Sequence, residues 1–432
     1  MKDYFYFSAF FSSVNTLMSL CLLLFYYRLF TNFVPTILNL VELIMTMNNP
    51  ISEVKQQPSR IVWLDVLRML AILMVICIHS ADPFNVTPEA RSNPEFNYWG
   101  SIYGSLLRPC VPLFVMITGV LLLPVKMSME AFYKKRLLRI AVPFLVWSVL
   151  YNLFPWVTGL LGLSPQVISE VFAYAPAGAS QSLADAMKGI ALIPFQFNVY
   201  TTHMWYLYML IGLYLYMPLF SSWVERASNR QKRLFLGLWG VTLCLPYAYA
   251  FLTTDLFGFC AWNPFGTFYY FAGFNGYLLL GHYLAREVKE WSWGKTLCVS
   301  LPLFAVGFVV TYLGFKAITA NPDSTEQEVE LFFLYCSPQV ALMTVALFQL
   351  VRKVKLRASG WVAMMANVTQ CGLGIYLVHY FVVGGGYALA DCLQVPVSLR
   401  IPVTAIIAFV CCWGFVAACY KWAPKCAKKL FG

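Results

Sequence analysis

The residues with the clearest capacity for chemistry lie in one apolar stretch, RIVWLDVLRMLAILMVICIH, which runs from Arg60 to His79. The stretch is apolar enough to cross a bilayer, yet it carries Asp65, Arg68 and His79, and ionisable side chains at membrane depth are costly unless they have a function. Arg68 and His79 are eleven residues apart, which on a helix is three turns plus roughly 20° and about 16 Å along the axis. With Asp65 near the same stripe, these side chains must face protein or water, so this helix is expected to line an internal cavity.

The remaining candidates are His203, His379 and Arg108, which all lie in or beside other apolar runs. An imidazole can take a proton from a hydroxyl while a guanidinium stabilises an oxyanion or a phosphate, and these are the ingredients of acyl transfer from a thioester. The same groups would serve a proton-coupled transporter, in which histidine titrates and arginine binds an anion. The residue types alone leave both functions open.

The composition of the chain predicts that transmembrane helices position these residues. Of the 432 residues, 60% are hydrophobic and 11% are charged, which predicts an integral membrane protein. The formal charge of +11 reflects membrane topology better than nucleic-acid binding, because the basic residues lie in short clusters between apolar segments. The predicted fold class is an all-α membrane protein with a ten-helix transmembrane core that encloses a polar cavity. The predicted spans are 61–81, 99–123, 140–163, 203–221, 234–253, 265–285, 296–315, 331–351, 361–383 and 401–420.

The loops between these spans alternate in charge. If residues 48–60 are cytoplasmic, 22 of the 30 Lys and Arg residues lie in the cytoplasmic loops and tail. The outer loops then hold only four, which are Arg91, Lys188, Lys316 and Arg400. Because basic residues concentrate on the cytoplasmic side of a membrane, both ends of the core are predicted to be cytoplasmic. Arg68 then lies toward the inner side, and His79, His203 and His379 lie near the outer one.

Four segments are expected along the chain. Residues 1–47 form a hydrophobic extension, interpreted either as an extra hairpin or as a mis-assigned start, and residues 48–60 form a cytoplasmic linker. Residues 61–421 form the ten-helix domain, and residues 422–432 form a basic cytoplasmic tail. Within the domain, Pro109 and Pro112 predict a bent second helix. Residues 189–203 are too few to cross before the fourth helix and are expected to be re-entrant or to lie along the outer interface.

Thirteen cysteines, including Cys244 and Cys411, are interpreted as small buried hydrophobic residues. No CxxC pair or His-Cys spacing of a zinc site is present, so neither a disulfide framework nor a metal is predicted.

Each candidate also has a simpler interpretation. A single histidine near a helix end can lie at the headgroup layer, and Arg108 can extend toward the outer headgroups. Trp205 is typical of an aromatic belt at the membrane interface. Four basic residues open the third helix and are most often a topology signal: Lys134, Lys135, Arg136 and Arg139. Three histidines at one depth, with an arginine-to-histidine ridge among them, favour a functional site over these separate explanations. His282 is assigned a structural role.

Five pieces of the chain carry a resemblance to a known family. LDVLRMLAILMVICIHS has an Arg and a His separated by ten residues, here Arg68 and His79. The others follow in order: LLRPCVPLFVMITGVLLL with Arg108, FYKKRLLRIAVPFLVW, HMWYLYMLIGLYLYMPLF with His203, and GIYLVHYF with His379. Together they resemble the motifs of the acyltransferase family 3 membrane enzymes over about residues 60–421. The chain departs from that pattern at Met69, where the family usually has Gly, and in its first 47 residues.

The resemblance implies an inner-membrane O-acyltransferase that modifies a surface glycan. Acetyl-CoA, reached from the cytoplasm, would be the donor, and a sugar hydroxyl of a cell-surface polysaccharide or its lipid-linked precursor would be the acceptor. The compact branch of the family, which has no added extracytoplasmic SGNH-type domain, is the one that the chain resembles.

Roles for the candidate residues follow from this resemblance. His79 would be the general base on the acceptor hydroxyl, or a transient acyl carrier. Arg68 and Arg108 would orient the thioester or stabilise the oxyanion, and Asp65 would fix Arg68. A supporting set would position the sugar or assist proton transfer, namely His203, Trp205 and His379. The four basic residues of the third helix would bind the CoA phosphates.

Two other classes remain as alternatives. A transporter or flippase for a glycan or small anion would often show internal repeats, and none is evident between the first and second five helices. A purely structural membrane subunit would not need Arg68, Arg108 and three histidines at one level. The expected partners are acetyl-CoA, the glycan acceptor and membrane lipids. Nucleic acid is not expected as a partner. The glycan, its hydroxyl and the oligomeric state stay open.

Overall fold

The computed structural model describes residues 61–163, 168, 171–172, 182–252, 268–321, 324–355 and 359–432. The expectations for residues 1–47 and 48–60 lie outside these described residues. Every regular element within them is helical, which confirms the predicted all-α class.

The described residues form helices and short helical turns in the following chain order. They are α3 (Val62–Asn85), α4 (Pro88–Ser92), α5 (Pro94–Leu106), α6 (Cys110–Leu122), α7 (Met129–Phe132), the π-helical turn η2 (Tyr133–Leu137), α8 (Leu138–Leu160), α10 (Leu183–Leu192), the 3₁₀ turn η3 (Thr202–Met204), α11 (Trp205–Arg226), α12 (Asn229–Thr242), α13 (Leu245–Phe251), α14 (Asn275–Arg286), α15 (Trp293–Thr319), α16 (Glu326–Glu330), the 3₁₀ turn η5 (Leu331–Phe333), α17 (Pro338–Arg352), α18 (Ser359–Cys392), α19 (Val397–Trp422) and α20 (Pro424–Phe431).

Nine helical segments within the described residues are long and apolar enough to cross a membrane, and each coincides with one of the ten predicted spans. The remaining span, predicted at 265–285, contains α14, whose 12 helical residues are fewer than a crossing needs. Residues 253–267, just before it, lie outside the described part.

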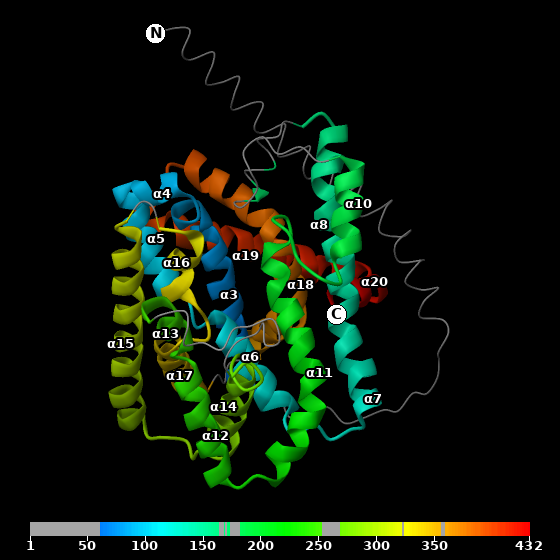
Figure 1. Cartoon of the computed structure of the whole chain (residues 1–432). Coiled ribbons are helices and arrows are strands. Elements are labelled where there is room, and N and C mark those ends of the chain that lie inside the picture. The colour runs from blue at the N-terminus through cyan, green and yellow to red at the C-terminus, as the bar shows by residue number, and fades with distance from the viewer. Residues whose placement is uncertain are drawn as a thin grey trace. The chain divides into compact units, whose positions relative to one another are not determined.

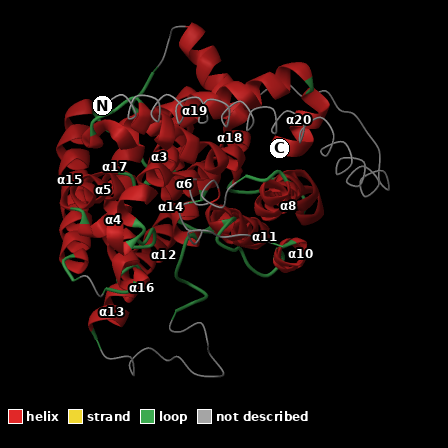
Figure 2. Ribbon diagram, turned by 90° about the horizontal axis from the view of Figure 1, so that it is seen from above, coloured by secondary structure: helices red, strands yellow, loops and turns green. Residues whose placement is uncertain are grey.

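The helix α3 lies in the middle of these segments. It packs against α5, α6, α17, α18 and α19, and Figure 2, which looks down several helices, shows it inside while α15 and α10 lie farther out. Its sequence explains this place, since α3 carries Asp65, Arg68, His79 and Asp82, which would have no hydrogen-bond partners against lipid. Leu64, Leu67 and Ala71 are among its fully covered residues. Figure 1 shows α3 among the other helices, and its polar residues are therefore held inside the helical core.

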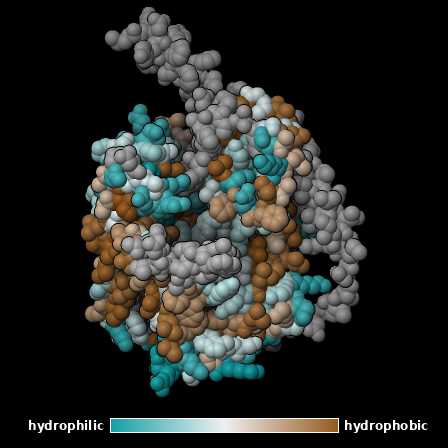
Figure 3. Space-filling view, in the orientation of Figure 1, coloured by the Kyte–Doolittle hydropathy of each residue, from teal (hydrophilic) through white to brown (hydrophobic). Residues whose placement is uncertain are grey.

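The surface of the described residues matches a membrane-embedded bundle. Figure 3 shows hydrophilic side chains near the upper and lower ends of this face and hydrophobic ones between them, for example over α15. On α15, Leu301, Val306 and Leu313 are exposed, as expected of side chains that contact lipid. Cys244 and Cys411 are exposed as well. Cys298, Cys392 and Cys426 are exposed too. The expectation that the cysteines are buried is wrong for these five, because an apolar run does not indicate which helix face turns outward.

The second span is broken where its prolines predicted a bend. The helix α5 ends at Leu106, a turn follows, and α6 begins at Cys110. Proline lacks the N–H that would continue the helical ladder, and its ring crowds the preceding turn. The break contains Arg108 and turns the first residues of α6 toward α3.

Two glycines bring α6 and α14 into close contact. A Cβ atom at Gly119 would lie 2.0 Å from the carbonyl oxygen of Leu278, and one at Gly281 would lie 2.2 Å from that of Met116. Any larger residue would force the backbones apart. This contact fixes the position of α6, which forms one wall of the site described below.

The last residues do not simply form a tail. Residues 422–432 include α20, which packs against α8, α18 and α19, and Leu430 and Phe431 are buried. The indole Nε1 of Trp147 donates to the Leu430 carbonyl oxygen at 2.9 Å. Its basic residues face outward while its apolar residues anchor it.

Candidate active site

Three histidines from three helices meet at one place. The ring centroids of His79 on α3 and His379 on α18 are 5.1 Å apart, and those of His379 and His203 are 5.5 Å apart. Tyr380 joins them, with its ring stacked on His203 at 4.5 Å and edge-on to His79 at 5.3 Å, between ring centroids. We call these four residues the histidine cluster. The equal depth predicted for the three histidines thus corresponds to direct proximity.

His79 is held by a carboxylate one turn away. Its Nδ1 lies 3.0 Å from Oδ2 of Asp82, at the i+3 position of the same helix. Because a carboxylate only accepts, the proton of a neutral His79 lies on Nδ1, and the lone pair of Nε2 is left for chemistry. Both side chains are largely covered, at 15% and 7% exposed.

The rest of the histidine cluster has polar atoms with no partner. His379 donates from Nδ1 to the Tyr376 carbonyl oxygen at 2.5 Å. Within the described residues, no hydrogen bond reaches His379 Nε2, either ring nitrogen of His203, or the Tyr380 hydroxyl, although all are buried. Buried polar atoms in folded proteins almost always have a partner. These atoms therefore mark a place suited to water or to polar groups of a substrate.

The segment before α11 is folded so that His203 enters this cluster. After α10, Asn198 donates from Nδ2 to Oδ1 of Asn152 at 2.7 Å, which ties the loop to α8. Thr201 and Thr202 then hydrogen-bond back to Asn198 and begin the turn η3. The Tyr376 hydroxyl donates to the His203 carbonyl oxygen. The predicted re-entrant or interfacial segment is thus a short helix and a hydrogen-bonded loop that deliver one histidine.

His79 lies between two cavities. The larger, of about 260 Å³, is lined by His79, Asp82, Thr87, Tyr380 and Tyr387 together with small and apolar residues. The smaller, of about 40 Å³, has His79 on one wall and is otherwise lined mainly by apolar and aromatic side chains. Of the residues that line the two, His79 alone belongs to both.

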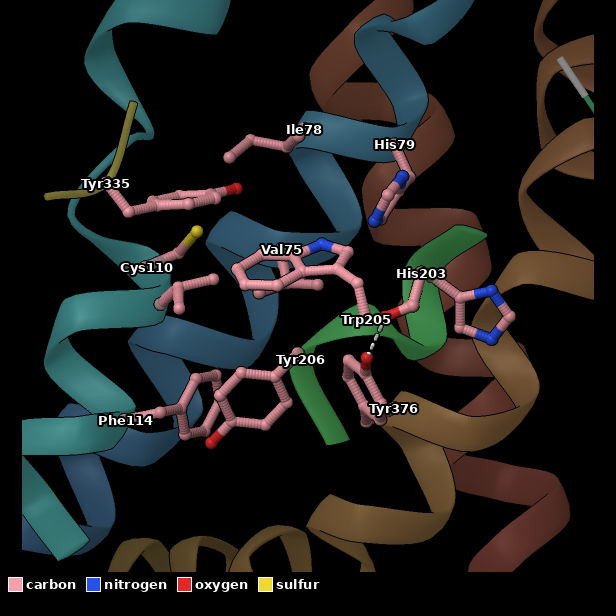
Figure 4. Close-up of a pocket in the computed structure, with 11 residues that line it drawn as sticks. Val75, Ile78, His79, Cys110, Phe114, His203, Trp205, Tyr206, Tyr335 and Tyr376 are labelled. Atoms are coloured by element: carbon pink, nitrogen blue, oxygen red, sulfur yellow. Dashed lines mark hydrogen bonds between the residues drawn. The ribbon is translucent and has the colours of Figure 1, made fainter. Parts of the chain in front are cut away.

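Figure 4 shows the small cavity. The far nitrogen of the His79 ring points into it, and the Tyr335 hydroxyl and Cys110 sulfur approach from the opposite side. The predicted supporting residue Trp205 forms part of its lining, stacked 5.4 Å from Tyr335. The His203 ring, by contrast, points away from the small cavity.

Arg68 lies at the other end of α3. Its NH1 is 3.3 Å from Oδ1 of Asp65, so the predicted pairing is present, and Asp65 also accepts from the Thr369 hydroxyl at 2.9 Å. The eleven residues to His79 correspond to about 16 Å along the helix. Arg68 is therefore too far away to contact a carbonyl on which His79 acts.

Arg108 differs from its predicted place at the reacting group. It is buried, its NH1 lies 3.8 Å from Oε2 of Glu330, and its guanidinium stacks 3.8 Å above the Phe333 ring. It is not among the residues that line either cavity. The guanidinium is 5.8 Å from the Tyr335 ring, so Arg108 supports the wall of the small cavity from behind. The cause is the helix break, which directs the side chain toward η5.

The basic residues of the third span open on a π-helical turn, η2, a distortion often found at functional sites. Lys134 and Lys135 are exposed there. Arg136 and Arg139 lie close enough to the Tyr214 hydroxyl to act on it electrostatically, and Arg68 does the same from α3. We call Arg68, Arg136 and Arg139 the arginine group. The sequence indicated Arg68 and the basic residues of the third span as two separate features. In the fold, both act on Tyr214.

One atom of the arginine group suits an anion. Arg136 Nε is buried and, within the described residues, has no hydrogen-bond partner. Arg139 Nε donates to the Gly432 carbonyl oxygen at 2.9 Å. Guanidinium groups bind anions through several parallel N–H donors, so the unpartnered Nε of Arg136 is a donor of that kind.

His282 has the structural place expected of it. It is buried, and its Nδ1 lies 3.2 Å from the Leu123 carbonyl oxygen. It belongs to neither cavity lining and ties α14 to the end of α6.

Sequence reasoning missed Asp82, Cys110, Tyr335 and Tyr380. Asp82 had a usable signal, since a carboxylate three residues after a histidine on a helix shares its face. The two tyrosines had none, because the sequence is rich in tyrosine and only packing selects those that meet His79.

Comparison with known proteins gave one match. The family model described as "Acyltransferase domain", that of acyltransferase family 3, matches residues 61–419. No curated protein matches the chain. No solved structure matches it either.

Proposed function

The chain belongs to acyltransferase family 3, and from that premise we propose that it transfers an acetyl group from acetyl-CoA to a sugar hydroxyl of a cell-surface polysaccharide or its lipid-linked precursor. We propose further that it works in an inner membrane, with both ends of the core and the donor in the cytoplasm. The loop charges support this orientation, because the basic residues concentrate in alternate loops.

One observation carries the proposal: His79 stands between two cavities with one nitrogen bound to Asp82. An acyl transfer needs the acceptor oxygen to contact the base and the thioester carbonyl carbon at once, so the base must lie where the two substrates meet. His79 lines both cavities and is fixed in one tautomer, so it meets that requirement.

The chemistry then follows from the geometry. Nε2 of His79 takes the proton of the acceptor hydroxyl while the oxygen attacks the thioester carbonyl carbon. The new C–O bond forms, the C–S bond breaks, and the proton passes to the sulfur, so CoA leaves as a thiol. The negative charge of Asp82 stabilises the imidazolium that forms between these steps. The Tyr335 hydroxyl, which points into the small cavity (Figure 4), can donate to the carbonyl oxygen as it becomes an oxyanion.

The large cavity suits the sugar ring of the acceptor, with the attacking hydroxyl extended past the edge of the His79 ring to Nε2. Tyr380 and Tyr387 offer aromatic faces, and Asp82 and Thr87 offer polar atoms beside His79. A sugar presents both C–H faces and hydroxyls, so it is complementary to such a lining. His203 and His379 do not line this cavity; their unpartnered nitrogens are buried beside His79 and would bind water.

The donor would be held at its phosphates by the arginine group and the exposed Lys134 and Lys135. About 16 Å separates Arg68 from His79 along α3. A donor whose phosphates and thioester lie far apart can span that separation, since the pantetheine arm of CoA is long and extended.

The deciding experiment removes the imidazole of His79. Membranes that contain the full-length chain are incubated with radiolabelled acetyl-CoA, and label is counted in the extracted glycan. The His79→Ala variant should lose the transfer by roughly 10²- to 10⁴-fold while it accumulates in membranes like the parent. A variant that retains activity within twofold would refute the assignment of His79 as the base. Label that stays on the parent protein when acceptor is withheld would favour the acyl-carrier route.

A further inference from the structure

The small cavity has the size and chemistry of an acyl group. It lies on the side of His79 where the far nitrogen points (Figure 4). Apart from His79 and His203, the described residues that line it include no charged or titrating group other than tyrosine and cysteine, and Val75, Val111 and Phe114 make it largely apolar. A neutral, compact group is therefore favoured there over a sugar or a phosphate.

The volume limits that group to a few atoms. A cavity needs roughly 10–15 Å³ to hold one water-sized group. The small cavity, at about 40 Å³, thus accommodates about three such groups, and an acetyl group has three non-hydrogen atoms. A propionyl group would need room for one more.

The aromatic residues that line the small cavity are packed against other rings, which opposes any enlargement of the cavity. Trp205 stacks on Tyr335 with centroids 5.4 Å apart, Phe114 lies 6.0 Å from Tyr206, and Tyr206 lies 5.5 Å from Tyr376. Rings that are held by other rings cannot rotate aside at small cost, because packed interiors yield little space.

We propose that the small cavity binds the acyl group of the donor during transfer and restricts it to acetyl, with Val111, Phe114 and Trp205 as the residues that set this limit. The inference rests on the proposed acyl transfer and adds to it the part of the site that selects the acyl group. During the transfer the carbonyl carbon lies at the mouth of the cavity beside His79, and the methyl group points inward.

The test compares two valines on α6. Val111 lines the small cavity, while Val115, one turn on, is equally buried and does not line it. Membranes with the full-length chain are given radiolabelled acetyl-, propionyl- or butyryl-CoA, and transferred label is counted in extracted glycan. The parent should favour acetyl over propionyl by roughly 10- to 200-fold, the usual discrimination for one methylene. Val111→Ala should raise the propionyl-to-acetyl ratio roughly tenfold or more, and Val115→Ala should leave it unchanged.

A second variant keeps the test decisive. If Val111→Ala does not accumulate in membranes, Val75→Ala opens the facing wall on α3 and should shift the ratio in the same direction. Equal use of acetyl and propionyl by the parent, or equal shifts in the Val111 and Val115 variants, would overturn the inference alone. No transfer from any of the three donors would overturn the proposed function, and the inference with it.

Discussion

At the scale of single residues, the two nitrogens of His79 have different tasks. Nδ1 is bound to Asp82, and Nε2 points into the small cavity (Figure 4). Asp82 contacts Nδ1 and does not contact the reacting atoms at Nε2. It therefore acts through the histidine, as a positioning residue. This division needs a carboxylate, since a neutral partner could bind either tautomer.

Replacing Asp82 by Asn is expected to disturb the orientation of the His79 ring without weakening the binding of acetyl-CoA. The amide can donate to Nδ1 and so favour the tautomer that has its proton on Nε2, which cannot act as the base. We expect kcat to fall roughly 10²-fold or more while KM for acetyl-CoA stays within twofold. Steady-state kinetics with purified protein would measure both.

The conservative variant supplies the control. Asp82→Glu keeps the charge and should recover part of kcat. If both variants lose activity in parallel with membrane accumulation, Asp82 has only a structural role.

At the scale of elements, the site depends on how α6 is placed. Two features set it: the proline break after α5, and the contact with α14 at Gly119 and Gly281. The break brings Cys110 and Val111 to the cavity, and the glycine contact holds the helix at the right depth. In membranes, small residues allow helices to approach this closely, and that approach supplies the packing energy.

Gly281→Ala tests the contact. The added Cβ would lie 2.2 Å from the Met116 carbonyl oxygen, so the helices must separate. Overpacking of this kind costs roughly 1–3 kcal/mol, which should appear as a lower thermal midpoint in detergent. Gly240→Ala on α12 is the matched control, because nothing lies within 4 Å of its Cβ. There a gain of up to about 1 kcal/mol is expected from helix propensity. An unchanged midpoint in the Gly281 variant would contradict the account of α6.

At the scale of the whole molecule, polar groups follow one another along α3. Arg68, Arg136 and Arg139 each act electrostatically on Tyr214, and His79 of the histidine cluster lies about 16 Å from Arg68 along the axis. Apolar helices surround both. Such an arrangement lets a charged donor and a polar acceptor approach one reaction centre from different ends while the lipid-facing surface stays apolar.

The proposed phosphate-binding residues, which are the arginine group with Lys134 and Lys135, can be tested by binding. Lys135→Gln with Arg136→Gln should weaken acetyl-CoA binding by roughly tenfold or more, because a hydrogen bond to a charged group contributes about 1.5–3 kcal/mol. Isothermal titration of detergent-purified protein would measure this change.

The matched control is Arg230→Gln with Arg233→Gln, two exposed arginines on α12 outside the arginine group. It removes two positive charges elsewhere and should leave affinity within twofold at 0.15 M salt, where distant exposed charges are screened. Equal losses in the two double variants would indicate a general effect of net charge.

Three features could be predicted from the amino-acid chain: the membrane class, nine of the crossing segments, and the common level of His79, His203 and His379. These follow from hydropathy and helical periodicity, which are local properties that a chain carries residue by residue. The Asp65 to Arg68 pair is of the same kind, since three positions on one helix fix its geometry.

The tertiary structure alone decided which of many tyrosines surround His79, that two cavities meet there, and that Arg108 faces Glu330 instead of the reacting group. It also joined Arg68 to Arg136 and Arg139. Each of these depends on how helices far apart in sequence turn about their axes when they pack. That rotation is set by the sum of many weak contacts and by close approaches such as Gly119 against Leu278, and no single stretch of sequence encodes it.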